Sequence, residues 1–382
     1  METGNPRRSR CRQLVVPEVS LYFHIPFCTK KCPYCHFYVL PNQARFHKLL
    51  GEGLAIEWER QLPLLREKRI VSIYFGGGTP TLFAPEGIGE ILERIRSSGV
   101  ELAPDCEITL EANPEECRPD LFESLLNLGI NRLSLGVQSL DARSLLQLER
   151  IHSAEKAKQA VLEAAAAGFE NISIDLMYDL PEQTEASWQS TLDQLNELPV
   201  RHLSLYNLTI EPHTAFHKRK ITIPQGELSL AFLNRALEKL EKIGLKRYEI
   251  SAFAVPGFES RHNLGYWTGR PFLGFGPSAF SYWEGERFRN QANLNRYCQN
   301  LRNHQSPVDF LERLPYPANE NELLAIRLRL KEGVEWNSGW PDETKKALDK
   351  LKSLGLIVQD QEIARLTERG LLFYDTVASE II

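Results

Sequence analysis

Six short apolar runs recur along the first part of the chain, and segments long enough for helices separate them. The runs occupy residues 19–25, 70–75, 106–110, 132–137, 172–177 and 202–208, and the helical segments occupy residues 43–65, 85–96, 119–128, 154–167 and 186–195. Strands that alternate with helices of this length predict βαβ units and a parallel sheet. Six such units predict an α/β fold with a partial (β/α)6 barrel, three-quarters of the eightfold barrel.

The pattern changes after the sixth run. A helix is predicted over 227–243, a segment rich in predicted loops follows, and the last part shows two helices (320–330 and 342–353) and a small hairpin (356–359 and 363–366). This order is typical of a winged-helix-like α+β module. We therefore expect a disordered basic tail (1–18), the barrel (19–245), a loop-rich extension (246–305) and a small C-terminal domain (306–382).

Three cysteines, Cys28, Cys32 and Cys35, follow the first predicted strand with the spacing C-x3-C-x2-C. A structural zinc site needs a fourth ligand, commonly from a second C-x2-C pair, and the sequence holds no such pair. Three thiolates on one loop suit a [4Fe–4S] cluster, because they can hold three irons and leave the fourth open to a small chelating molecule. The alternative is three structural cysteines near a turn.

A polar or glycine-rich segment ends each of the six predicted strands. Since the loops at the carboxyl ends of parallel barrel strands form the active site, we expect these segments to converge. The glycine triplet alone equally fits a tight turn, and Asp175 inside an apolar strand needs a partner or a ligand, for which Arg150 is one candidate. The segments are the cysteine loop, Gly76-Gly77-Gly78-Thr79-Pro80, Glu111-Ala112-Asn113-Pro114, Gly136-Val137-Gln138-Ser139, Asp175, and Asn207 with Thr209.

Composition and charge narrow the class of protein. A formal net charge of −5 over 382 residues gives no strong field for nucleic acid, and we expect no nucleic-acid partner. Seven cysteines, three of them in one motif, favour a reducing compartment over a disulfide framework. No apolar run approaches the roughly 18 residues of a membrane-spanning helix. We expect a cytoplasmic protein, and the four arginines near the N-terminus leave peripheral contact with an anionic membrane open.

These motifs together resemble the radical S-adenosylmethionine (SAM) family, and in particular its oxygen-independent coproporphyrinogen oxidase (HemN-like) branch. The resemblance covers residues from about 19 to the C-terminus and rests on the cysteine motif, the GGGTP loop and the segments around Glu111, Gln138, Arg150 and Asp175. It implies a [4Fe–4S] cluster held by Cys28, Cys32 and Cys35, and up to two SAM molecules. Contacts to the first SAM would come from Tyr22, Gly77 and Glu111, and contacts to the second from Tyr34, Gly78, Thr79, Gln138, Arg150 and Asp175.

Two features direct the resemblance away from the oxidase and toward the related heme chaperones of the HemW family. Phe37 stands where the oxidases carry a further cysteine, and residues 262–267 form the motif H-N-x-x-Y-W. The resemblance implies that His262, Tyr266 and Trp267 contact heme. A neutral imidazole can bind heme iron, and the aromatic rings offer flat apolar area for a macrocycle. The residues alone equally allow packing of a lid over the barrel.

Three functions from different classes follow. The first is a heme chaperone that binds heme and transfers it to hemoproteins such as respiratory-chain enzymes, with an electron donor for its cluster and a homodimer left open. The second is an oxygen-independent coproporphyrinogen III oxidase. The third is a radical SAM enzyme with another substrate. The residues around His262 and Phe37 favour the first, and the shared SAM-binding residues do not separate it from the second.

Overall fold

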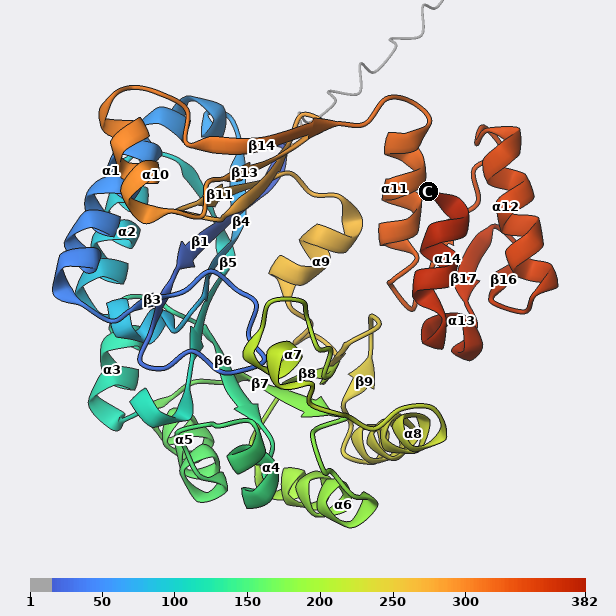
Figure 1. Ribbon diagram of the computed structural model, residues 1–382. Helices are drawn as coiled ribbons and strands as arrows, with labels where there is room; N and C mark the ends of the chain where they lie inside the picture. The colour runs from blue at the N-terminus through green and yellow to red at the C-terminus, as the bar shows by residue number, and fades with distance from the viewer. Residues whose placement is uncertain (1–15) are drawn as a thin grey trace, which may run out of the picture.

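The computed structural model describes residues 16–382, and its centre is a six-stranded parallel sheet curved into a partial barrel (Figure 1). Neighbouring strands pair in the order β1-β4-β5-β6-β7-β8, all parallel. This confirms the predicted partial barrel. Its strands are β1 (Glu18–Ile25), β4 (Arg69–Gly77), β5 (Glu101–Ala112), β6 (Arg132–Gln138), β7 (Asn171–Tyr178) and β8 (His202–Asn207).

Helices cover the outer face of this barrel, and their bounds match the predicted segments within two residues. Apolar side chains such as Leu21, Phe23, Ile73 and Leu133 point outward from the strands and form one core with the helices. The covering helices are α1 (Ala44–Leu65), α2 (Glu86–Ser97), α3 (Pro119–Asn127), α5 (Ala154–Ala167), α6 (Glu185–Gln194) and α8 (Glu227–Lys242). Short elements on the connections are β2 (Phe27–Cys28), β3 (Leu40–Pro41), α4 (Ala142–Gln147) and α7 (Ala215–Arg219).

The inner face of the barrel is unusually polar. Residues at alternate positions of the strands, such as Ser20, Ser72, Glu107, Arg132 and His202, point inward and are buried. Successive side chains of a strand point to opposite faces, so one strand supplies both an apolar outer surface and a polar inner one. Buried polar groups need partners, and the interior is therefore a place where ligands and hydrogen-bond networks can be held.

The segment 246–305, which we expected to be rich in loops, contains five short strands and two helices joined by loops. β9 and β10 extend the sheet beyond β8, and β11 pairs parallel with β1, so that the sheet has twelve strands with β14 at its other edge. Strands of two to five residues carry too little periodicity to be recognised alone, and pairing with an existing edge stabilises them. The elements are β9 (Lys246–Arg247), β10 (Ala252–Ala254), α9 (Arg261–Thr268), β11 (Phe272–Phe275), β12 (Phe280–Trp283), β13 (Glu286–Asn290), α10 (Leu294–Arg302) and β14 (Val308–Arg313).

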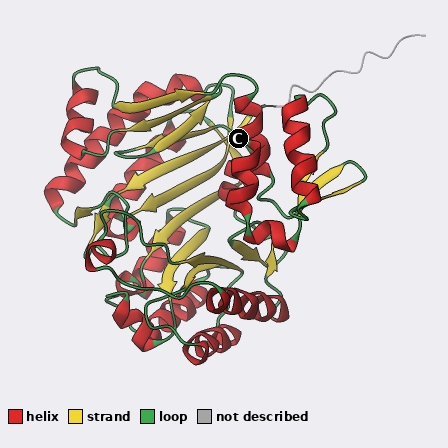
Figure 2. Ribbon diagram, turned by 45° about the vertical axis from the view of Figure 1, so that its right-hand side comes forward, coloured by secondary structure: helices red, strands yellow, loops and turns green. Residues whose placement is uncertain are grey.

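The C-terminal part packs around a hydrophobic core of its own, which includes Leu324, Leu348, Ile357 and Val377. It lies beside the open side of the barrel, next to α9 in Figure 1, and Figure 2 gives a second view of it. The predicted order of helix, helix and hairpin is confirmed, and a third strand and two short helices complete it. Its elements are α11 (Ala318–Arg327), β15 (Val334–Glu335), α12 (Asp342–Ser353), β16 (Ile357–Asp360), β17 (Ile363–Leu366), α13 (Glu368–Leu372) and α14 (Tyr374–Ile381).

Two expectations concern the ends and the surface of the chain. The basic tail expected over 1–18 lies for the most part outside the described residues, and β1 already begins at Glu18. Within residues 16–382, no helix has both the length and the apolar character to cross a membrane.

Candidate functional site

A cavity of about 480 Å³ opens at the carboxyl ends of the barrel strands. The three motif cysteines and every predicted SAM contact except Tyr22 line it, although they come from five different strands and the segments that follow them. The convergence expected from the polar strand ends is therefore present in the structure. The lining residues among those predicted are Cys28, Cys32, Cys35, Tyr34, Gly77, Gly78, Thr79, Glu111, Gln138, Arg150 and Asp175.

The cysteine loop leaves the end of β1 and forms one wall of this cavity. Two hydrogen-bond donors approach its sulfur atoms: Arg150 Nη1 lies 3.4 Å from Cys32 Sγ, and Thr79 Oγ1 lies 3.8 Å from Cys28 Sγ. Such donors favour thiolates, the form that binds iron. Among residues 16–382, no group of three His, Cys, Asp or Glu side chains is already arranged to hold a metal ion.

The glycine triplet lies against the backbone of the cysteine loop. Gly78 N donates to Ile25 O at 2.9 Å, and Thr79 N donates to Phe27 O at 2.7 Å. A Cβ atom at Gly78 would lie 2.5 Å from Phe27 O, and Gly77 has a φ of +114°. Only glycine allows this close approach together with a positive φ. The triplet thus fixes the end of β4 to the loop that carries Cys28.

Two carboxylates, Glu111 and Asp175, face the cavity from β5 and β7. Glu111 accepts hydrogen bonds from Tyr74 Oη at 2.7 Å and from Gly77 N at 3.1 Å. Burial raises the pKa of Glu111 to about 7, and the nearby charge of Asp175 adds to the shift. Burial also raises the pKa of Asp175 to about 6. Two carboxylates in a buried cavity are complementary to a ligand that carries positive charge, such as the amine and sulfonium groups of SAM.

Arg150 is not the direct partner of Asp175 that we considered. Its Nη2 donates to Asn113 Oδ1 at 2.6 Å and to Gly136 O at 2.9 Å, while its Nη1 contacts Cys32 Sγ. Arg150 therefore holds β6 and the segment after β5 against the cysteine loop.

Gln138 ends β6 with a φ of +64°, which is uncommon outside glycine and occurs at functional sites. Tyr22 lies deeper in the barrel, where its ring stacks on Tyr74 at 6.1 Å between centroids.

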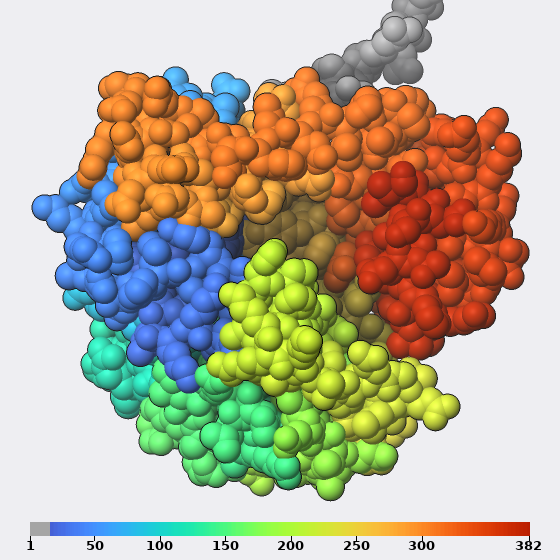
Figure 3. Space-filling view, viewed as in Figure 1, coloured from blue at the N-terminus to red at the C-terminus, as the bar shows by residue number. Residues whose placement is uncertain are grey.

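The predicted heme residues lie on α9, which packs into the open side of the barrel and not into the cavity of the cysteines. His262 is buried, with Nδ1 3.0 Å from Ser72 Oγ and Nε2 2.9 Å from Tyr266 Oη. Tyr266 and Trp267 are partly exposed. Figure 3 shows a hollow bounded by the segment leading into β14, the segment around α7 and the C-terminal part, with the colour of the α9 region at its floor.

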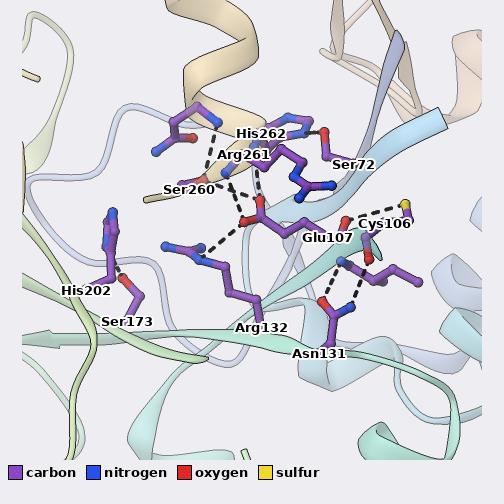
Figure 4. Close-up of polar contacts among 12 residues, drawn as sticks. Ser72, Cys106, Glu107, Asn131, Arg132, Ser173, His202, Ser260, Arg261 and His262 are labelled. Carbon is purple, nitrogen blue, oxygen red and sulfur yellow. Dashed lines mark hydrogen bonds and ion pairs between the residues drawn. The ribbon is translucent and has the colours of Figure 1, made fainter. Parts of the chain in front are cut away.

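The structure also reveals site residues that the sequence reasoning missed. Glu107 accepts hydrogen bonds from the backbone N–H groups of Arg261 and His262, both at 2.9 Å, and lies 3.9 Å from Arg132 Nε (Figure 4). It therefore fixes the first turn of α9 to the barrel interior. Asp175 was recognised because it is a charged residue inside an apolar strand. Glu107 and Arg132 show the same pattern and could have been recognised in the same way. Ser72 carries no such signal.

The comparisons with known proteins agree with this geometry. The family model described as the radical SAM superfamily matches residues 22–195. The chain is 32% identical to the heme chaperone HemW of Haemophilus influenzae, an alignment that covers 94% of this chain and 96% of the relative. It is 31% identical to the heme chaperone HemW of Escherichia coli, with 95% of this chain and 97% of the relative covered.

A solved structure shares the fold over nearly the whole chain. It is the coproporphyrinogen III oxidase HemN from Escherichia coli, described as a radical SAM enzyme, with a TM-score of 0.84 and 25% identity over 96% of this chain and 90% of that one. The fold therefore does not separate chaperone from oxidase, and the family assignment rests on the sequence identities to the HemW relatives. The chain belongs to the heme chaperone HemW family within the radical SAM superfamily.

Proposed function

We propose that this protein is a heme chaperone, which binds heme and transfers it to hemoproteins. The observation that carries the proposal is the identity of 31–32% to heme chaperones HemW over 94–95% of the chain. The H-N-x-x-Y-W motif on α9 adds to it, because it combines an imidazole with two aromatic rings near a hollow of the surface. Respiratory-chain enzymes are the recipients that we propose.

The cavity at the strand ends fits a [4Fe–4S] cluster and SAM. Cys28, Cys32 and Cys35 would hold the cluster, and the hydrogen bonds from Thr79 to Cys28 and from Arg150 to Cys32 favour the thiolate form of those two. Glu111 and Asp175 would receive the positive groups of SAM. Gly77 and Gly78, which have no side chains, would let SAM come close to the protein backbone. The bound pair would supply one-electron chemistry, for which an electron donor is needed.

His262 has the protonation state that a heme ligand requires. Burial, together with the nearby charges of Arg270 and Arg132, lowers the pKa of His262 to about 3. The imidazole is therefore neutral at physiological pH and keeps a lone pair for iron. Tyr266 and Trp267 lie on the same helix, one turn further on, and offer apolar area to the macrocycle.

An anaerobic heme titration of the cluster-reconstituted protein tests this proposal. We expect saturable binding near one heme per chain by the Soret band, and a weaker or spectrally altered complex in His262→Ala. His47→Ala is a suitable control, because His47 lies on α1 and packs between Phe27 and Phe83. Absence of saturable binding in the unaltered protein would refute the chaperone function.

Oxidase activity is a second candidate, and the shared fold with the coproporphyrinogen III oxidase favours it. Phe37, at the mouth of the cavity and 54% exposed, replaces the further cysteine of the oxidases. With SAM, a reductant and coproporphyrinogen III, we expect no formation of protoporphyrinogen IX at catalytic turnover. Its formation would make the oxidase the better description.

A further inference from the structure

Ser72, a residue of the barrel wall, contacts the histidine of the heme motif. It lies on β4, is fully buried, and its Oγ is 3.0 Å from His262 Nδ1. The other ring nitrogen, Nε2, lies 2.9 Å from Tyr266 Oη. Both nitrogens of His262 therefore have hydrogen-bond partners, and the neighbouring groups decide which nitrogen carries the hydrogen.

The neighbours of Ser72 settle that choice. Its hydroxyl donates to Ser20 Oγ at 2.9 Å, and Arg270 Nη1 also donates to Ser20 Oγ at 3.3 Å. A hydroxyl has a single hydrogen, so Ser72 can offer His262 only a lone pair. Nδ1 of His262 must then be the donor. A neutral ring that donates through Nδ1 carries its lone pair on Nε2, which lies 2.9 Å from Tyr266 Oη and accepts from it.

This arrangement is the one that metal-binding histidines use. Such a histidine binds the metal through one nitrogen and donates the hydrogen of the other to a nearby acceptor, which fixes the ring and raises its basicity. We propose that Ser72 is a positioning residue that fixes His262 as an Nε2 ligand for heme iron, and that the Tyr266 hydroxyl occupies Nε2 until heme arrives. The inference rests on the proposed heme-binding function and assigns its geometry.

The contacts around α9 would allow the Tyr266 side chain to move away from His262 while His262 keeps its position. Glu107 holds the backbone N–H of His262 at 2.9 Å, at the first turn of α9. Tyr266 lies one turn further along and is partly exposed, whereas His262 is 1% exposed. Since Tyr266 is partly exposed and His262 is buried, heme that approaches α9 from the surface would meet the tyrosine first. Rotation of the Tyr266 side chain would then expose the lone pair without breaking the Ser72 contact.

The barrel contains a matched control for this geometry. Ser173 Oγ lies 2.8 Å from His202 Nδ1, and His202 Nε2 lies 2.9 Å from Tyr248 Oη. Ser173 and His202 of this second serine–histidine–tyrosine series are also buried on the inner face of the sheet, and Figure 4 shows both serine–histidine pairs. Its histidine is outside the heme motif. Ser173→Ala therefore removes the same kind of contact without touching His262.

The test uses the full chain with its cluster reconstituted, and the variants Ser72→Ala, Ser72→Thr, Tyr266→Phe and Ser173→Ala. Nitrogen-15 NMR of the heme-free protein reads the tautomer of His262 directly, and we expect the Nδ1–H form.

We expect Ser72→Ala to weaken heme binding by about 10- to 100-fold and to lower the iron–histidine stretching frequency in resonance Raman spectra. Ser72→Thr, which keeps the hydroxyl, should restore both readouts. Tyr266→Phe should bind heme more tightly, and Ser173→Ala should match the unaltered protein.

The outcomes separate the two proposals. An Nε2–H tautomer in the heme-free protein would overturn the role of Ser72. So would a Ser72→Ala complex with the affinity and stretching frequency of the unaltered protein. If the unaltered protein itself fails to bind heme saturably, the chaperone function fails instead.

Discussion

At the scale of single residues, Gly77 in the cofactor cavity has no room for a side chain. A Cβ atom there would lie 2.5 Å from the ring of His24, and the φ of +114° disfavours any side chain. We expect Gly77→Ala to lower the free energy of unfolding by about 1–3 kcal/mol. Gly51 on α1 has no atom within 4 Å of such a Cβ, and Gly51→Ala should raise stability by up to about 1 kcal/mol. Urea denaturation measures both, and equal effects would contradict the argument.

Glu57 is a second residue with a measurable consequence. It is buried, and it accepts hydrogen bonds from Gly276 N at 2.8 Å, Asn290 Nδ2 at 2.6 Å and Tyr297 Oη at 2.5 Å. Burial raises its pKa from 4.5 to about 7. The folded state therefore binds this proton more tightly than the unfolded state, so stability from this group is present below pH 4.5 and falls as the pH rises to about 7.

The expected loss across that pH window is about 3 kcal/mol, because each pKa unit corresponds to roughly 1.4 kcal/mol. Glu57→Gln removes the titrating group and keeps an acceptor oxygen. The difference in unfolding free energy between the two proteins should therefore change between pH 4.5 and 7. A constant difference over this range would show that Glu57 does not titrate there.

At the scale of elements, α9 depends on a buried carboxylate at its first turn. Glu107 accepts from two backbone N–H groups of α9, and it faces Arg132, which is 2% exposed. Without Glu107, the backbone N–H groups of Arg261 and His262 lose their acceptor, and the buried charge of Arg132 loses its nearby carboxylate. We expect Glu107→Ala to cost about 3–5 kcal/mol of stability.

Asp105 provides the matched control for Glu107. It pairs with Arg261 Nη2 of the same helix at 2.7 Å, but its side chain is 70% exposed. Exposed ion pairs contribute little, so Asp105→Ala should cost much less stability than Glu107→Ala. Chemical denaturation compares the two variants, and a similar cost for both would show that Glu107 does not anchor the helix.

The elements also show what the sequence could and could not predict. The barrel strands and helices were predictable because each is long enough to show a periodic pattern. The cysteines, the glycine triplet and Glu111 were predictable because each motif is local. The contacts of Ser72 and Glu107 with α9 were not, since they join residues 190 and 155 positions apart in the chain. The short strands β9–β13 were missed because pairing, and not their own pattern, forms them.

At the scale of the whole molecule, Arg329 joins the C-terminal part to the barrel. Its guanidinium lies 4.1 Å from the ring centroid of Trp267 on α9, 5.1 Å from that of Tyr374, and its Nη2 is 3.2 Å from Glu249 Oε2. A planar guanidinium both stacks on rings and binds a carboxylate, and lysine does not replace it fully.

We expect Arg329→Ala to loosen the C-terminal part and to expose Trp267. Hydrogen exchange of residues 261–268 and 318–381 should become faster, with an intermediate effect in Arg329→Lys. Arg369→Ala is the control, because Arg369 lies 6.0 Å from the Phe373 ring within the C-terminal part itself. Unchanged exchange in Arg329→Ala would mean that other contacts hold the two parts together.

The central claim is that this protein delivers heme and does not only bind it. Stopped-flow spectroscopy should follow heme from the loaded protein to an apo-hemoprotein whose Soret band is distinct. We predict a transfer rate that rises with the concentration of the apo-hemoprotein and exceeds the rate of heme release to a non-interacting scavenger. A transfer rate equal to that release rate, whatever the acceptor concentration, would contradict the account, since the protein would then be only a heme binder.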